Sequence, residues 1–254
     1  MVVAVCGAVG WWLVSCREVQ SPEEGILSLS PVRLPSPGLV QGDTMRDSTG
    51  LVAPLRVVAY GVAGDTLHNV VATFVALDTG AHLDGALLIG DKAGTTVRVI
   101  GSVAAIQTQP TLPVPVTLSP DTLVPADSVT HHRTYSLIAG DTIVAADLNT
   151  NVLHRVGAAP SGVGAVIVRY LIERAPPGVN NAQTLVLLNG SAPSNRDTSA
   201  VPSGSASLKA RLRLLALNTF TTDTALISAT ASYAGRQLGR VLFTLIFTNT
   251  SSSP

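Results

Sequence analysis

The feature that most constrains the fold is a strict alternation of apolar and polar side chains near the C-terminal end. Residues 207–217 read S-L-K-A-R-L-R-L-L-A-L. The apolar set is Leu208, Ala210, Leu212, Leu214 and Ala216, and the charged set between them is Lys209, Arg211 and Arg213. Successive side chains of a β-strand point to opposite faces, so this period predicts a strand with one buried and one solvated face.

Two later segments, 223–233 and 238–247, repeat this alternation and are separated by a glycine turn at 234–236. Their apolar faces would hold Ala225, Ile227, Ala229, Ala231 and Tyr233, and then Val241, Phe243, Leu245 and Phe247. Residues 163–173 form another predicted strand. An alanine-rich strand, a glycine turn and an aromatic final strand resemble the last two strands of many Ig-like sandwich domains.

The composition agrees with a fold made of strands. No helix-period apolar segment of convincing length occurs, whereas Val and Thr are plentiful and 22 Gly and 16 Pro residues are scattered along the chain. The 254 residues allow one or two domains with a core that needs neither disulfides nor metal. With 46% apolar and 13% charged residues, the composition excludes a disordered chain.

Turn-rich stretches divide the chain into two candidate domains, at 25–118 and 133–248, with a tail at 249–254. The stretch between them, 119–132, reads SPDTLVPADSVTHH and leaves little to bury, so it is predicted to be a linker. Strands of the first domain are expected near 26–34, 51–60, 70–77, 86–89, 95–103 and 114–118.

Residues 64–103 resemble the bacterial Ig-like domain family. The resemblance is carried by V-V-A-T-F-V-A-L-D at 70–78 and by A-G-T-T-V-R-V at 93–99, where an Ala-Gly-Thr turn opens a late strand. We therefore expect an all-β fold of two tandem Ig-like β-sandwiches. Such folds place function in loops at the ends of the sheets, and 190–204 is the longest candidate loop.

The N-terminal stretch MVVAVCGAVGWWLVSC carries no charged side chain. A transmembrane helix needs about 20 apolar residues, which is more than this run offers. A core strand would rarely be this long. A secretory signal needs an apolar region of about 7 to 15 residues followed by small residues, and the run fits that length. Residues 1–15 are therefore interpreted as a signal peptide and 16–24 as a tether.

The end of this stretch, Leu13, Val14, Ser15 and Cys16, resembles the lipobox of bacterial lipoproteins. The resemblance implies cleavage before Cys16, a diacylglycerol on its thiol, and an exported protein anchored in the cell envelope. Arg17 rather than Asp follows, which favours the outer over the inner membrane. The sequence departs from the family pattern because no Lys or Arg precedes the apolar run. The mature chain would have no spare thiol and no disulfide.

One dipeptide, Asp-Thr, recurs through the chain and accounts for seven of the twelve aspartates. Asp caps a turn by bonding to nearby backbone, and Thr suits the first position of a strand. Repeated aspartates can also bind Ca²⁺, but no D-x-D-x-D-G spacing is present. The pattern therefore predicts turns.

The sequence contains little that points to catalysis. It has no G-x-S-x-G motif and no Gly-rich phosphate loop between a strand and a helix. Among the five histidines only His131 and His132 are close, and neighbours on an extended chain point apart, so no metal and no cofactor are expected. After the tether the one glutamate is Glu173. The formal net charge is zero, so no overall field would draw the chain onto nucleic acid.

The nearest thing to a binding patch is the cationic stripe Lys209, Arg211 and Arg213, with Arg169 as a possible fourth member. Such a stripe could meet acidic polysaccharide, lipopolysaccharide or phospholipid headgroups, although charges on a strand also solvate its outer face and prevent edge-to-edge association. Stacking platforms for sugars would need exposed aromatic rings, for which the candidates are Tyr60, Tyr135 and Tyr170.

These observations favour a non-enzymatic envelope lipoprotein that serves adhesion, scaffolding or protein–protein interaction. Its partners would be the membrane, through Cys16, and an envelope protein or polysaccharide. The alternative is a ligand- or carbohydrate-binding accessory module of an envelope complex. A remote alternative is a β-sandwich hydrolase, which would need several acids or histidines converging in one pocket.

The lipid anchor can be tested by metabolic labelling. Radiolabelled palmitate should enter the wild-type protein and not the Cys16→Ser variant, because the thiol is the only attachment point that the lipobox resemblance provides. Equal labelling of the two proteins would exclude the anchor.

Overall fold

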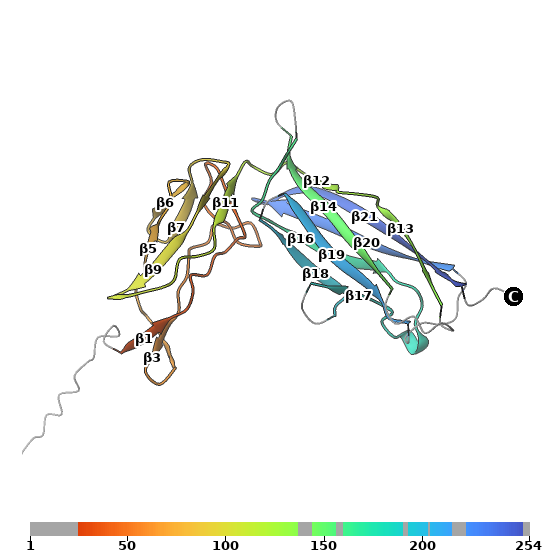
Figure 1. The fold of residues 1–254 in the computed structure, drawn as a ribbon, viewed down its shortest axis with the longest axis horizontal. Helices are drawn as coiled ribbons and strands as arrows, with labels where there is room; N and C mark the ends of the chain where they lie inside the picture. Colours follow the sequence, from red (N-terminus) through yellow and green to blue (C-terminus); the bar gives the residue numbers. More distant parts are fainter. Residues whose placement is uncertain are drawn as a thin grey trace, which may run out of the picture.

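The structure is a computed structural model that describes residues 25–136, 144–155, 160–189, 193–202, 204–214 and 222–250. The signal, the lipobox residues, the tether and Ala216 lie outside the described residues, as do residues 251–254 of the tail. The predicted all-β sandwich class is confirmed. The described strands form two units, one in each half of the chain (Figure 1). Each unit has its own hydrophobic core.

The second unit is a sandwich of two five-stranded sheets. The first sheet has the order β12 (Thr122–Pro125), β14 (Val144–His154), β19 (Ser205–Leu212) and β17 (Leu185–Leu188), with the short β15 (Ser161–Gly162) paired to β14. The other has the order β13 (Thr130–Tyr135), β21 (Arg236–Asn249), β20 (Thr222–Tyr233), β16 (Val166–Arg174) and β18 (Arg196–Val201).

Most neighbouring strands of this sandwich are antiparallel, but β13 runs parallel to β21. Their register extends from Thr130 opposite Thr244 to Tyr135 opposite Asn249. The chain crosses between the sheets on successive strands, from β16 to β17, then to β18 and to β19. A one-turn 3-10 helix, η1 (Val179–Asn181), lies between β16 and β17.

The predicted facing of the alternating strands is confirmed. On β19, Leu208, Ala210 and Leu212 are buried, whereas Lys209 between them is exposed. The apolar faces of β20 and β21 bury the predicted alanines and aromatics, and Tyr233 packs against the same core. The alternation therefore predicts correctly which face of each strand packs against the opposite sheet of the sandwich.

The first unit contains shorter strands in four small sheets, with orders β1-β3-β4, β10-β9-β5, β2-β11-β8 and β6-β7. Its strands are β1 (Ile26–Leu29), β2 (Leu39–Val40), β3 (Ala59–Gly61), β4 (Thr66–Leu67), β5 (Thr73–Ala76), β6 (Ala81–Asp84), β7 (Leu87–Gly90), β8 (Thr95–Val97), β9 (Val99–Val103), β10 (Ile106–Gln107) and β11 (Val114–Thr117). The core is mostly aliphatic, and it includes Leu39, Met45, Leu88, Val97 and Val116.

Two segment predictions need correction. The predicted linker, 119–132, contains β12, which pairs with β14, and the beginning of β13. The predicted loop at 190–204 contains β18, which pairs with β16. All three are edge strands that bury few side chains, such as Leu123 on β12 and Val201 on β18, so their sequences look like loops. The passage from β11 to β12 is therefore only the few residues between 117 and 122.

Within the described part of the chain, no helix has the length and apolar character that crossing a membrane would require.

The division of the β19 side chains into a buried and an outer face gives a prediction about stability. Leu212→Asp should lower the free energy of unfolding by at least about 3 kcal/mol, because it places a charge in a site that is 1% exposed. Arg211→Asp should change it by less than about 1 kcal/mol, since this side chain lies on the outer face. Urea unfolding of both variants measures the difference, and equal losses would contradict the energetic asymmetry of the two faces.

Candidate functional site

The turn at Gly42-Asp43-Thr44 in the first unit is the start of a polar network. One carboxylate oxygen of Asp43 accepts the backbone N–H of Thr44 at 2.8 Å, which is the predicted turn chemistry. The guanidinium of Arg46 donates two hydrogen bonds to the same carboxylate, from Nε to Oδ2 at 2.7 Å and from Nη2 to Oδ1 at 3.0 Å. Nη1 of Arg46 donates to the backbone oxygen of Gly50 at 3.0 Å, so the loop is held closed.

Tyr233, the last residue of β20, extends this network into the second unit. Its hydroxyl donates to Oδ2 of Asp43 at 2.6 Å, across 190 positions of sequence. The guanidinium carbon of Arg46 lies 6.0 Å from the centroid of the Tyr233 ring, within the range of a cation–π contact. The two units are therefore joined by a charge-assisted hydrogen bond to a carboxylate that is already paired.

The ionisation of these groups favours the joined state. Burial acts to raise the pKa of Asp43, but the hydrogen bonds from Arg46 and Tyr233 outweigh it, so the pKa of this carboxyl lies below its usual value. Burial, and then the hydrogen bond to the Asp43 carboxylate, raise the pKa of Tyr233 well above its usual value. The carboxylate thus stays charged and the phenol stays neutral over a wide range of pH.

Close backbone contacts surround the network. A Cβ at Gly38 would meet the backbone nitrogen of Ala165 at 2.8 Å, and one at Gly50, whose φ is +90°, would meet that of Gly235 at 3.2 Å. The backbone N–H of Gly164 donates to Oγ1 of Thr117 at 3.3 Å. One small hollow beside the network, lined by Arg46, Ala165 and Tyr233 among others, has a volume of about 10 Å³, which is room for about one water molecule. We call this set of contacts between the units the junction.

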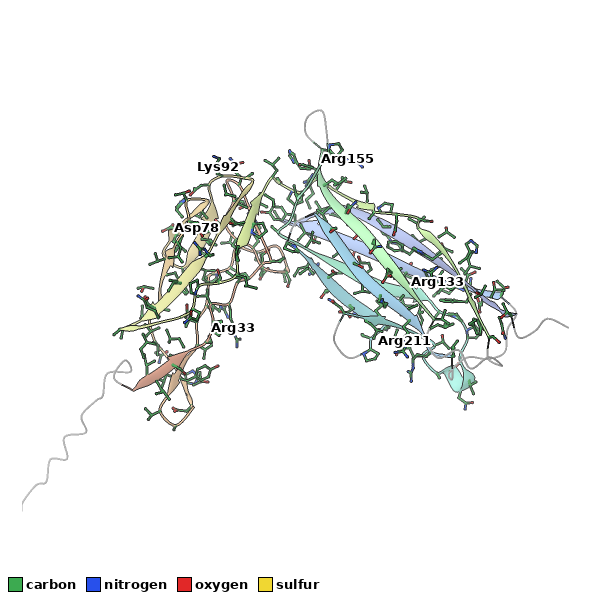
Figure 2. All side chains as sticks on the ribbon, in the orientation of Figure 1. Arg33, Asp78, Lys92, Arg133, Arg155 and Arg211 are labelled. Carbon is green, nitrogen blue, oxygen red and sulfur yellow. The ribbon has the colours of Figure 1, made fainter. Side chains whose placement is uncertain are left out.

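The predicted cationic patch is divided by the structure. Lys209 and Arg211 lie on β19, in the sheet that also holds β14, and Figure 2 labels Arg211 there. The ammonium group of Lys209 lies 3.7 Å from Asp147. Arg213 follows the end of β19 and is exposed. Arg169 lies on β16 in the opposite sheet, and Nη2 of Arg169 donates to the backbone oxygen of Ser48 in the first unit. The stripe and Arg169 are not one patch.

Arg169 instead lines an open hollow of about 720 Å³ on the outer face of the sheet formed by β13, β21, β20, β16 and β18. We call this the arginine hollow, because Arg196 from β18 and Arg240 from β21 line it too. Its other outward-facing residues are Leu171, Glu173, Thr198, Ser228 and Thr230. Register places Thr198, Arg169, Thr230 and Arg240 in one row across four strands.

Two acidic residues, Glu173 and Asp197, line the hollow, and the carboxylate of Glu173 is already hydrogen-bonded. Hydrogen bonds from Ser228 and then from Arg240 lower the pKa of its carboxyl. Ser228 lies on the outward side of β20 but is only 4% exposed, and its hydroxyl is hydrogen-bonded to Glu173. Among the described residues, neither Arg169 nor Arg196 forms an ion pair with a carboxylate, so the hollow retains an excess of positive charge.

The remaining candidates of the sequence take simpler roles. His131 turns inward toward Phe243, with ring centroids 6.2 Å apart, whereas His132 is exposed, so the two point apart as expected. Tyr135 and Tyr170 are 2% and 1% exposed and offer no stacking surface. Asp197 and Asp223, like Asp43, accept the N–H of the Thr that follows. In the described ranges, no three His, Cys, Asp or Glu side chains gather as metal ligands would.

Sequence reasoning did not find the junction or the arginine hollow. The Gly-Asp-Thr motif predicts a turn at Asp43, and the alternation predicts that Tyr233 lies on the core face of its strand. The contact between them depends on how the two units meet. Arg196 and Arg240 share a face with Arg169 only because β18 and β21 belong to its sheet.

No protein family matches the chain, and no curated protein matches it. Solved structures with some likeness include S-layer protein SbsC domains 4 and 5, at 12% identity over 87% of this chain and 96% of that one, with a TM-score of 0.31. Titin domains z1z2 in complex with telethonin share 11% identity over 90% of this chain and 99% of theirs, with a TM-score of 0.27. A protein of unknown function from Porphyromonas gingivalis W83 shares 13% identity over 86% of this chain and 100% of that one, with a TM-score of 0.30. Likeness at this level carries no argument about function.

The junction gives a pH-dependent prediction. Tyr233→Phe removes a hydrogen bond to a charged, partly buried carboxylate, so the unfolding free energy at pH 7 should fall by about 1.5–3 kcal/mol. The Asp43 pKa is depressed, so its contribution is present above its unfolded value and lost as the pH falls. The difference between variant and wild type should therefore shrink at pH 3.

Urea unfolding of the full chain at the two pH values measures this effect. Tyr60→Phe is the matched control, because the hydroxyl of the half-buried Tyr60 makes no hydrogen bond to another described residue. A loss for Tyr233→Phe no larger than for Tyr60→Phe would show that the hydrogen bond contributes nothing to stability.

Proposed function

We propose that the chain is a non-enzymatic module of the bacterial cell envelope, exported and anchored through a lipid on Cys16. Its two β units act together as a scaffolding or adhesion element that holds a binding surface at a fixed distance from the membrane. The observation that carries the proposal is the junction, which ties the units by side-chain and backbone contacts rather than leaving them on a flexible linker.

Three features support this reading. The connection from β11 to β12 is short, and the hydroxyl of Thr117, at the end of β11, accepts a hydrogen bond from Gly164 in the second unit. The contact between Asp43 and Tyr233 is neither exposed nor purely ionic, so salt screens it less than a surface pair. The tether predicted at 16–24 would enter the first unit at β1, which leaves the second unit as the distal part.

The specific role in adhesion is part of this proposal, and so is the favoured location at the outer membrane, which comes from Arg17 following Cys16. A second function, binding of a ligand by an accessory module, is favoured by one observation. The arginine hollow gathers cations from three strands on the outer face of one sheet, beside the contact of Arg169 with Ser48 of the first unit.

Spin-label distance measurement tests the fixed spacing. Labels would be placed through Leu112→Cys in the first unit and Val179→Cys in the second, both exposed, in a full chain that also carries Cys6→Ser and Cys16→Ser. We expect one narrow distance distribution, because hydrogen bonds and close backbone contacts of the junction join the units. The added change Gly38→Asp should broaden it, since any Cβ there meets the backbone of Ala165.

The matched control is Gly25→Asp, where a Cβ meets nothing within 4 Å. A broad distribution for the unmodified chain would overturn the proposal of a fixed spacer. An unchanged distribution for Gly38→Asp would show that the junction is not what fixes the spacing.

A further inference from the structure

We propose that the arginine hollow is a binding site for an acidic polysaccharide whose sugars carry carboxylates, such as a chain of uronic acids. The site lies on the outer face of the five-stranded sheet and takes residues from β16, β18, β20 and β21. It names the ligand class for the second function considered above, and it does not rest on the proposed spacing role.

The charges of the hollow select an anion. Three arginines and two acidic residues, Glu173 and Asp197, line the hollow, which leaves one net positive charge. Arg240 pairs with Glu173, whereas Arg169 and Arg196 form no ion pair with a carboxylate among the described residues. Arg169 gives one of its donors to the neutral backbone oxygen of Ser48, which orients the guanidinium without cancelling its charge. A guanidinium presents five N–H donors in a planar fork that suits a carboxylate, so donors remain free for a ligand.

The spacing of the cations suits an extended chain rather than a single small anion. Arg169 and Arg240 flank Thr230 in one row, two strands apart, which corresponds to roughly 10 Å between their backbones. Arg196 stands opposite Leu171, one strand over and two positions along from Arg169. A ligand that met all three would lie across the strands and carry more than one negative group.

The uncharged surface of the hollow suits sugar hydroxyls. Thr198 and Thr230 supply hydroxyl groups that both donate and accept hydrogen bonds. Leu171, which is 38% exposed, gives an apolar patch between them. The aromatic residue beneath the hollow, Tyr170, is buried, so no ring is available to stack against a neutral sugar or a nucleobase.

The acidic residues of the hollow argue against a denser polyanion. Glu173 and Asp197 line the hollow together with the cations and would repel a nucleic acid or polyphosphate, in which charges follow one another closely. A uronic acid chain carries one charge on each ring, with hydroxyl groups between charges. Binding without stacking depends on charge-assisted hydrogen bonds, so it should be moderate in affinity and weakened by salt.

Calorimetric titration of the full chain, carrying Cys16→Ser and kept in mild detergent, tests the site. The probe is an oligogalacturonate, and the comparison ligand is a neutral malto-oligosaccharide of equal length. We expect binding of the acidic chain alone. Arg196→Gln should weaken it roughly tenfold through loss of a charge-assisted contact. Leu171→Glu should weaken it further, because it places a carboxylate in the middle of the hollow.

Arg211→Gln is the matched control, since it removes the same charge from the outer face of the opposite sheet. The site is refuted if the acidic chain does not bind, if the neutral chain binds equally, or if Arg211→Gln weakens binding as much as Arg196→Gln. Preferred binding of polyphosphate or of phosphatidylglycerol vesicles would overturn the choice of a polysaccharide. Spin-label distances in Arg196→Gln should match those of the parent, which separates failure of this site from failure of the spacing role.

Discussion

The arrangement of the whole molecule depends on one partly buried carboxylate, that of Asp43. It accepts two hydrogen bonds from Arg46 within its own unit and one from Tyr233 of the other unit. Because Arg46 compensates the charge locally, the carboxylate can be partly desolvated, and the phenol then gains a strong acceptor. The glycines at Gly38 and Gly50 allow the backbones to approach closely enough for this contact to form.

The sequence predicted local features well and nonlocal ones poorly, for a physical reason. Strands β19, β20 and β21 can be predicted because apolar and polar residues alternate along a strand that has one buried and one exposed face. Strands β12, β13 and β18 lie at sheet edges and bury few side chains, so their prolines, aspartates and hydroxyl residues were interpreted as linker and loop. The turn at Asp43 was predicted, but its contact with Tyr233 depends on the packing of two separate cores.

The same distinction explains the cationic patch. Alternation shows that Lys209, Arg211 and Arg169 all face outward, and this facing is correct. Alternation cannot show which of two sheets a strand joins, and the two outer faces of a sandwich point away from each other. Arg169 consequently shares a surface with Arg196 and Arg240, while the stripe on β19 lies on the other side. Sheet assignment, more than residue type, decides which charges can act together.

The parallel pairing of β13 with β21 has a mechanical consequence. A pull applied between the start of β13 and the end of β21 acts along both strands, because they run in the same direction. The backbone hydrogen bonds between the two strands run across the direction of the force. They must therefore break together, in shear, rather than one after another as when a hairpin is pulled open. A tensile force that entered through the short passage from β11 and left at the C-terminal end would load the pairing of β12 with β14, and then this six-residue ladder from Thr130 to Tyr135.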